Sequence, residues 1–311
     1  MVAQLLIVLD GAPEPPGGSR PTTLQRTATP ALDALCAAGV VTRRQTTPDG
    51  FEPGTETGFP TLLGVPPAAP VARGPIEAAA AGIAVPPGAS AWRIDLRRRD
   101  GSRADERERD RALPALARAL PAHRVTGLRG HRLLAVGPGR PVLDRIDGLG
   151  VEVWPDGAQL APALDKDTIV VCGPGAAAGC ARLLGASVVE PAGATGDVDT
   201  DLAAKADAAR RALAVGSEVG VHVGALDEAA HRGEPDAKAA ALARVDAELI
   251  APLAAAAQRH GASVAVTADH STCPDTGRHG CEPVPLVVAG PGVAASGPDR
   301  LTEELPPGVV A

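Results

Sequence analysis

The chain has 311 residues, a formal net charge of −7, 45% apolar residues and 22% charged residues, which leaves room for one large domain or a core with a second, smaller domain. Aromatic residues make up only 1%, so the aromatic platforms on which single-stranded nucleic acid stacks are nearly absent, and the negative charge disfavours any phosphate backbone as a partner. The first apolar run, residues 2–9, is too short for a membrane span and lacks the basic flank of a signal peptide. Five cysteines, an odd number, do not predict a disulfide framework, and we expect reduced thiols in a cytoplasmic protein.

Strands and helices alternate along the chain in the pattern of an α/β sheet. Residues 4–11 (QLLIVLDG) predict a buried strand that ends in an acid, and a helix follows, capped by Thr29, with Pro30 in its first turn and Gly39 at its end. The second half predicts strands over 167–173, 186–190, 218–224, 262–270 and 284–290, and helices over 199–216 and 236–261 with a kink at Pro252. We expect these strands to complete a parallel core with ligand-binding residues at their carboxyl ends.

The segment between these two halves has a different composition. Residues 92–111 are dense in charges of both signs and are expected to form a solvated hairpin or helix face, and short strands are predicted over 131–137 and 150–154. We therefore expect a smaller α+β domain over residues 70–160, inserted into a core made of residues 1–69 and 161–311.

Carboxylates and imidazoles, the donors that hold divalent cations, follow three of the predicted strands. They are Asp10 after the first strand, Asp227 and His231 one helical turn apart after the 218–224 strand, and Asp269, His270 and His279 after the 262–270 strand. Any one of these groups alone could be structural. Their joint placement at the ends of strands in one predicted sheet favours a metal centre.

A hydroxyl nucleophile is predicted at Thr55. The stretch 52–64 (EPGTETGFPTLLG) places Thr55 after Pro-Gly at the start of an apolar helical run, and a helix N-terminus favours an anion. A plain threonine cap is the alternative. Beside two metal ions, the Thr55 hydroxyl would be a credible phosphoryl acceptor. A zinc site from Cys273, Cys281 and His279 is a further alternative, but no paired C-x-x-C motif supports it.

Seven motifs in order resemble one known family. They are IVLDG at 7–11, the helix that opens at Thr29-Pro30, PGTET at 53–57, RGPIEA at 73–78, GATGDVDTDLAAKA at 193–206, HVGALDEAAHRGE at 222–234 and ADHSTCPDTGRHGCEPVPLVV at 268–288. The resemblance spans most of the chain and is to the archaeal-type, cofactor-independent phosphoglycerate mutases of the alkaline phosphatase superfamily.

This resemblance implies an α/β fold with an alkaline-phosphatase-like core: a mainly parallel sheet flanked by helices that holds two divalent ions, foremost Mn²⁺, with Mg²⁺ or Zn²⁺ as alternatives. By position, one ion would be shared by Asp10, Thr55, Asp269 and His270, and the other held by Asp227, His231 and His279. Thr55 would carry the phosphoryl group between the two hydroxyls of a small phosphorylated acid, interconverting 3- and 2-phosphoglycerate. Candidate binders of the substrate's anionic groups are Arg73, Arg93, Arg129 and Arg132.

Three departures from the family pattern concern the substrate more than the metals. Thr55-Glu56 replaces the family's Ser-Asp, Asp95 replaces the asparagine of an F-R-x-N motif, and the segment 143–166 is shortened. These changes leave open a different mutase, a phosphatase or a homoserine-kinase-like enzyme acting on another small phosphorylated or phosphonate acid. A non-catalytic module on the same fold is a further alternative. The oligomeric state does not follow from the sequence.

Overall fold

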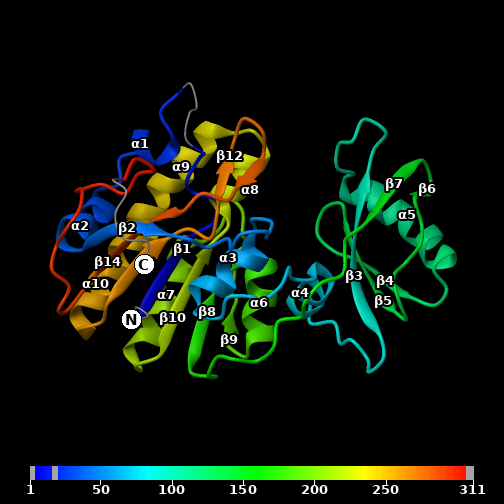
Figure 1. Ribbon diagram of the computed structural model, residues 1–311, viewed down its shortest axis with the longest axis horizontal. Helices are drawn as coiled ribbons and strands as arrows, with labels where there is room; N and C mark the ends of the chain where they lie inside the picture. The colour runs from blue at the N-terminus through cyan, green and yellow to red at the C-terminus, as the bar shows by residue number, and fades with distance from the viewer. Residues whose placement is uncertain (1–3, 16–19, 306–311) are drawn as a thin grey trace. The chain divides into compact units, whose positions relative to one another are not determined.

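The computed structural model describes residues 4–15 and 20–305 and divides into two compact units, residues 1–67 with 162–311, and residues 68–161 (Figure 1). The core ranges predicted from the sequence also include residues 1–3, 16–19 and 306–311, which lie outside the described residues. Within the described ranges, no helix combines the length and the apolar character that a bilayer crossing requires.

The first unit is built on a seven-stranded sheet with the order β2-β14-β11-β1-β10-β8-β9. At its centre lies β1 (Leu5–Leu9), which pairs in parallel with β10 (Glu218–Val223) and β11 (Val264–Thr267). The parallel strands β8 (Thr168–Val171) and β9 (Ser187–Val189) extend the sheet beyond β10. All five residues of β1 are buried, as expected of a continuous apolar strand with both faces covered.

One edge of this sheet is antiparallel. The strand expected over 284–290 to complete a parallel core is β14 (Val284–Ala289), and it runs antiparallel to β11 and to β2 (Val40–Arg44). The expectation was wrong because β11 and β14 are joined through the hairpin of β12 (Ser271–Cys273) and β13 (Arg278–Gly280), not through the long crossover that a parallel pair requires. The predicted α/β class with a mainly parallel sheet is confirmed.

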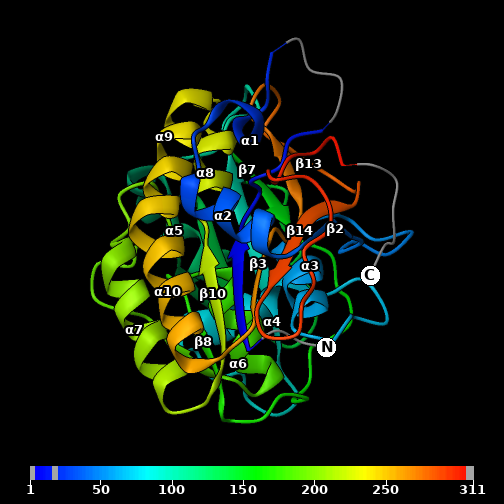
Figure 2. The ribbon, with the colours of Figure 1, turned by 90° about the vertical axis from the view of Figure 1, so that its left-hand side faces the viewer.

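Helices cover both faces of the sheet (Figure 2). One face carries α2 (Pro30–Ala38), α7 (Leu202–Ala214), α9 (Pro235–Val245) and α10 (Ala251–His260), whose apolar residues form one cluster with β1. The other carries α3 (Thr55–Leu62) and α6 (Ala176–Leu184). Two short helices, α1 (Thr23–Arg26) and α8 (Ala225–His231), lie in the connections after β1 and β10.

The cap of α2 comes from a distant part of the chain. Thr29 occupies the N-cap position, but its hydroxyl donates to the Asp33 carboxylate and caps no helix amide, contrary to expectation. The carboxylate of Asp246 instead accepts from the amides of Ala31 and Leu32 at 3.0 and 2.8 Å. A π-helical turn (Asp246–Ile250) between α9 and α10 carries this carboxylate. It lies just ahead of the proline at which the sequence predicted a kink, a residue with no N–H for the preceding turn.

The second unit is a five-stranded antiparallel sheet with two helices. Its strand order is β4 (Arg124–Gly127), β5 (Arg132–Gly137), β3 (Ser90–Arg97), β7 (Leu149–Val153) and β6 (Arg145–Ile146), and its helices are α4 (Arg73–Ala80) and α5 (Glu106–Ala119). The charged run expected to be solvated begins as the buried strand β3, so that expectation was wrong there. Trp92, Ile94 and Leu96 face α5, and the alternate residues face α4.

Candidate metal centre

The predicted metal ligands gather at the carboxyl ends of three adjacent strands. Asp10 follows β1, Asp227 lies on α8 directly after β10, and Asp269 follows β11. Parallel neighbours end at the same edge of a sheet, so residues more than 200 positions apart meet there. Two groups form, one of Asp10, Asp269 and His270 and one of Asp227, His231 and His279, and within each group the candidate ligand atoms all lie within 4.8 Å of one another.

The first cluster is buried, and its candidate ligand atoms lie close together. His270 Nε2 lies 3.2 Å from Asp10 Oδ1 and 3.9 Å from Asp269 Oδ1. Among the described residues neither Asp10 Oδ1 nor His270 Nε2 has a hydrogen-bond partner, a condition that costs about 1–3 kcal/mol for a buried polar group. A cation bound by these donors would offset that cost, so the residues fit a divalent ion.

Electrostatics in the first cluster point the same way. Burial and the negative charges of Asp269 and Asp227 raise the pKa of Asp10 well above its usual value. Burial also acts to raise the pKa of Asp269, but the imidazoles of His270 and His222 outweigh it and lower that pKa. Two carboxylates in one buried place repel each other, and a cation between them relieves the repulsion.

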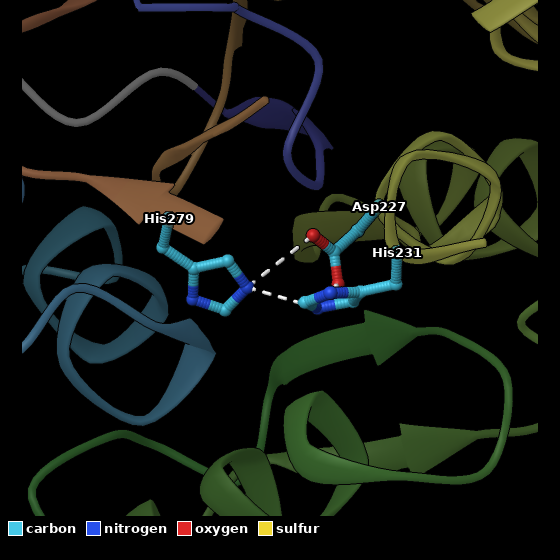
Figure 3. A group of neighbouring side chains, drawn as sticks. All are labelled: Asp227, His231 and His279. Atoms are coloured by element: carbon cyan, nitrogen blue, oxygen red, sulfur yellow. Dashed lines mark hydrogen bonds and ion pairs between the residues drawn. The ribbon is translucent and has the colours of Figure 1, made fainter. Parts of the chain in front are cut away.

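The second cluster is half-buried, and its three side chains converge on one point (Figure 3). His231 Nε2 lies 3.2 Å from one oxygen of Asp227, and His279 Nε2 lies 3.5 Å from the other. The two Nε2 atoms are 3.1 Å apart. Against the effect of burial, hydrogen bonds from both imidazoles lower the pKa of Asp227. One carboxylate and two imidazoles are a donor set suited to a transition-metal ion or zinc.

The two clusters adjoin each other. The rings of His270 and His279 stack with their centroids 3.9 Å apart and their planes 26° apart. The Thr272 hydroxyl donates to Asp227 Oδ1 at 2.6 Å and lies 3.3 Å from His270 Nδ1. The two clusters are therefore in direct contact and form one centre with two candidate metal sites.

The segment around Thr55 touches both clusters. Before Thr55, the carbonyl of Pro53 lies 3.0 Å from His279 Nδ1. After it, a Cβ on Gly58 would stand 2.1 Å from the carbonyl oxygen of Asp269, so α3 rests directly on that backbone and only glycine fits there. Thr55 is the first residue of α3, is buried, and lies in the chain between the two residues that make these contacts.

A fourth imidazole, His222, was missed by the sequence analysis. It lies on β10 with its Nε2 3.5 Å from Asp269 Oδ2 and 3.6 Å from Asp10 Oδ2, and the ring of Phe59 meets it edge-on at 5.1 Å. In the sequence this histidine sits inside an apolar strand and is easily interpreted as a core residue. The one signal that the sequence offers is a polar side chain within an otherwise apolar stretch of the strand.

The candidate substrate-binding arginines belong to the second unit, where Arg93 is already paired. Its Nε and Nη2 donate to the two oxygens of Asp95 at 2.8 and 3.0 Å, and its Nη1 lies 3.2 Å from Glu77. His131 Nε2 lies 3.3 Å from Asp95, and the guanidinium lies 4.2 Å from the ring centroid of Trp154. Arg93 is 4% exposed.

The other three arginines divide between this cluster and the surface. Arg73 reaches the Glu77 carboxylate at 3.4 Å. Arg132 is the cross-strand partner of Asp95, which places it on the same face of the sheet. Arg129 is exposed in the turn between β4 and β5. Cys273 and Cys281, the residues of the alternative zinc site, belong to neither of the two metal-ligand groups found among the described residues.

Comparisons with known proteins place the chain among metalloenzymes. The chain matches the metalloenzyme superfamily over residues 3–306. It is 30% identical to 2,3-bisphosphoglycerate-independent phosphoglycerate mutase 1 of Archaeoglobus fulgidus over 91% of this chain and 88% of the relative. It is 31% identical to the 2,3-bisphosphoglycerate-independent phosphoglycerate mutase of Methanopyrus kandleri over 86% and 82%.

Two solved structures share the fold. The PH0037 protein from Pyrococcus horikoshii has a TM-score of 0.75 at 26% identity, covering 96% of this chain and 88% of that one. The cofactor-independent phosphoglycerate mutase from Thermoplasma acidophilum has a TM-score of 0.61 at 22% identity, covering 98% and 94%.

The chain matches a superfamily of metalloenzymes, and its two carboxylate–imidazole clusters could each hold a metal ion. The chain belongs to the metalloenzyme superfamily and, within it, to the family of 2,3-bisphosphoglycerate-independent phosphoglycerate mutases, metal-dependent isomerases. The resemblance drawn from the motifs is thereby confirmed.

Proposed function

We propose that the chain interconverts 3- and 2-phosphoglycerate by phosphoryl transfer through a phosphothreonine at Thr55. One observation carries the proposal: Thr55 begins α3 between a contact to His279 of one cluster and a contact to Asp269 of the other. A hydroxyl at the amide-rich start of a helix, in a segment that contacts both clusters, is well suited to attack a phosphate ester. The names of the curated relatives support phosphoglycerate as the substrate.

Two divalent ions are part of the proposal. The first would be held by Asp10, Asp269 and His270 together with Thr55, and the second by Asp227, His231 and His279. Mn²⁺ is the first candidate because it accepts carboxylate and imidazole donors together, with Mg²⁺ and Zn²⁺ as alternatives. Such ions supply Lewis acidity that withdraws charge from a hydroxyl and from phosphoryl oxygens.

The chain's own part in the reaction is to accept the phosphoryl group and return it. Thr55 Oγ1 forms a bond to phosphorus while the bond from phosphorus to the C3 oxygen of the substrate breaks. The proton lost by Thr55 is taken up by the departing oxygen, so that glycerate and phosphothreonine result. The C2 hydroxyl of the same glycerate then attacks phosphothreonine and restores the Thr55 hydroxyl, with no net gain or loss of water.

In this proposal the unit of residues 68–161 is the substrate domain, and Arg73, Arg93, Arg129 and Arg132 bind anionic groups of the substrate. A second candidate function rests on the pairing of Arg93. Two carboxylates already neutralise this guanidinium, so it would add little to the binding of a further carboxylate. Phosphoglycerate would then lose one proposed contact to its carboxylate, and the second candidate is a different mutase, a phosphatase or a homoserine-kinase-like enzyme that acts on another small phosphorylated or phosphonate acid.

The experiment compares four forms of the Mn²⁺-loaded protein: wild type, Thr55→Ala, Thr55→Ser and the control Thr57→Val. Thr57 is a buried threonine of the same helix whose hydroxyl donates to the carbonyl of Glu52, so it matches Thr55 in position but not in the proposed role. We expect isomerisation of 3-phosphoglycerate by wild type, Thr55→Ser and Thr57→Val, and none by Thr55→Ala. Full activity in Thr55→Ala would remove the nucleophile from the proposal.

The same assay separates the candidate functions. Release of inorganic phosphate without isomerisation would indicate a phosphatase, and turnover of another phospho-acid in a panel without turnover of phosphoglycerate would favour the second candidate. A non-catalytic module would turn over no ester. Mass spectrometry of the quenched enzyme should find phosphate on the peptide that contains Thr55.

A further inference from the structure

Two of the three lysines in this chain are fully buried, and each lies behind one of the two clusters. Lys205 comes from α7 and Lys238 from α9, and both are 0% exposed. Burying an ammonium is costly unless it is paired or hydrogen-bonded. The proposed reaction leaves both residues without a role.

Lys205 is connected to the first cluster through His222. Its Nζ donates to the main-chain carbonyl of His222 at 3.0 Å. The His222 ring faces the Oδ2 atoms of Asp269 and Asp10, at 3.5 and 3.6 Å. Because a single ring nitrogen faces two acceptors, we assign it the proton. This leaves the Oδ1 atoms of both carboxylates on the side of His270, where the ligand atoms of the cluster meet.

Lys238 is connected to the second cluster through Thr272 in the same way. Its Nζ donates to the main-chain carbonyl of Thr272 at 2.9 Å and lies 3.6 Å from the Glu14 carboxylate. The hydroxyl of Thr272 donates to Asp227 Oδ1 at 2.6 Å. In both cases an ammonium holds a backbone carbonyl, and the side chain of that same residue holds the carboxylate of a candidate ligand.

We propose that Lys205 and Lys238 are positioning residues, each of which orients the carboxylates of one cluster through a single intermediate residue. Lys205 acts through His222 on Asp10 and Asp269, and Lys238 acts through Thr272 on Asp227. The inference rests on the proposed function only in that the clusters bind metal ions. Removing a group that hydrogen-bonds a metal ligand typically costs about 10- to 100-fold in metal affinity, and a lysine that fixes such a group should have an effect of up to that size.

The test measures Mn²⁺ affinity for each cluster separately. An Asp269→Asn background leaves the second cluster intact, and a His231→Ala background leaves the first. Lys205→Met and Lys238→Met, which keep the chain length but remove the ammonium, are placed in each background, with the exposed Lys166→Met as control. Metal-free protein is titrated with Mn²⁺ and the free ion is followed by electron paramagnetic resonance.

We expect Lys205→Met to weaken Mn²⁺ binding by about 10- to 100-fold where only the first cluster remains and by less than about threefold where only the second remains. Lys238→Met should show the reverse, and Lys166→Met should change neither. Equal loss at both clusters, or no loss at the cluster that each lysine adjoins, would overturn the inference. The thermal midpoint of each metal-free variant reports separately on folding.

Substitutions of the intermediate residues His222 and Thr272 test the same connection while both buried lysines stay in place. His222→Gln and Thr272→Ser keep a donor, whereas His222→Leu and Thr272→Val do not. We expect the first pair to retain Mn²⁺ affinity and the second pair to lose it. Equal loss in both members of a pair would contradict a positioning role. A wild-type chain that binds no Mn²⁺ would count against the proposed function, whereas Mn²⁺ binding without mutase activity would leave this inference standing.

Discussion

Asp95→Asn is expected to destabilise the second unit strongly at neutral pH. Asp95 is 1% exposed and accepts two hydrogen bonds from Arg93 and one from His131. Removing one partner of a buried ion pair costs about 3–5 kcal/mol. Asparagine keeps one acceptor oxygen, and Glu77 still lies 3.2 Å from Arg93, so we expect the lower end, about 3 kcal/mol.

The pH dependence of this loss has a definite sign. Burial raises the pKa of Asp95, but hydrogen bonds from His131 and Arg93 outweigh it and hold the pKa below its usual value. A carboxyl whose pKa is lowered on folding stabilises the fold above its unfolded pKa of about 3.9 and loses that effect as the pH falls through the folded value. The difference between wild type and Asp95→Asn should therefore be full at neutral pH and shrink below about pH 4.

Tryptophan fluorescence during urea unfolding measures this unit selectively, because both tryptophans of the chain, Trp92 and Trp154, belong to residues 68–161. The matched control is Glu152→Gln. Glu152 is the cross-strand partner of Asp95 on β7, but its side chain is 52% exposed and pairs with Arg97 at the surface, where such a pair contributes about 0–1 kcal/mol. Equal losses in the two variants, or a loss for Asp95→Asn that does not depend on pH, would refute the reasoning.

Three further outcomes are expected. Asp246→Ala should lower the unfolding free energy by about 2 kcal/mol and speed amide exchange at the start of α2, because the carboxylate that caps this helix is removed; unchanged exchange there would contradict it. Gly58→Ala should abolish activity and Mn²⁺ binding at the first cluster, because the new Cβ meets the Asp269 carbonyl, whereas Gly220→Ala, which makes only ordinary contacts, should not. Chelation should end activity and lower the melting temperature. The raised pKa of Asp10 means that the metal-free fold loses stability as the pH rises through that value, so the gain in melting temperature with Mn²⁺ should grow with pH, and a pH-independent gain would argue against ions at Asp10.

The candidate ligands could be predicted because their position depends on a general property of parallel sheets. Asp10, Asp227 and Asp269 each follow an apolar strand, and the carboxyl ends of neighbouring parallel strands meet. Their role as metal ligands stays a prediction. His222 could not be found in this way, because a histidine within a buried strand has no local pattern that separates ligand support from core packing.

Contacts between distant parts of the chain, and the direction of a strand, could not be predicted from local sequence patterns. The cap of α2 joins Asp246 to amides more than 200 positions earlier, which no sequence window contains. The direction of β14 depends on its connection to β11, which forms the hairpin of β12 and β13, and not on its own residues. Arg93 was predicted to bind an anion because of its chemistry. In the fold, however, a neighbour on the sheet and one on α4 supply carboxylates that already neutralise its charge.

The burial of two lysines also determines where reagents that modify amines can react with this protein. Apart from the α-amino group, Lys166 carries the one side-chain amine that acylating reagents can reach in the folded chain, because Lys205 and Lys238 have no exposed surface. A dye or tether attached through amines would therefore concentrate at one known position, on the loop before β8. Slow labelling of the other two would report transient opening of the protein interior next to the candidate metal ligands.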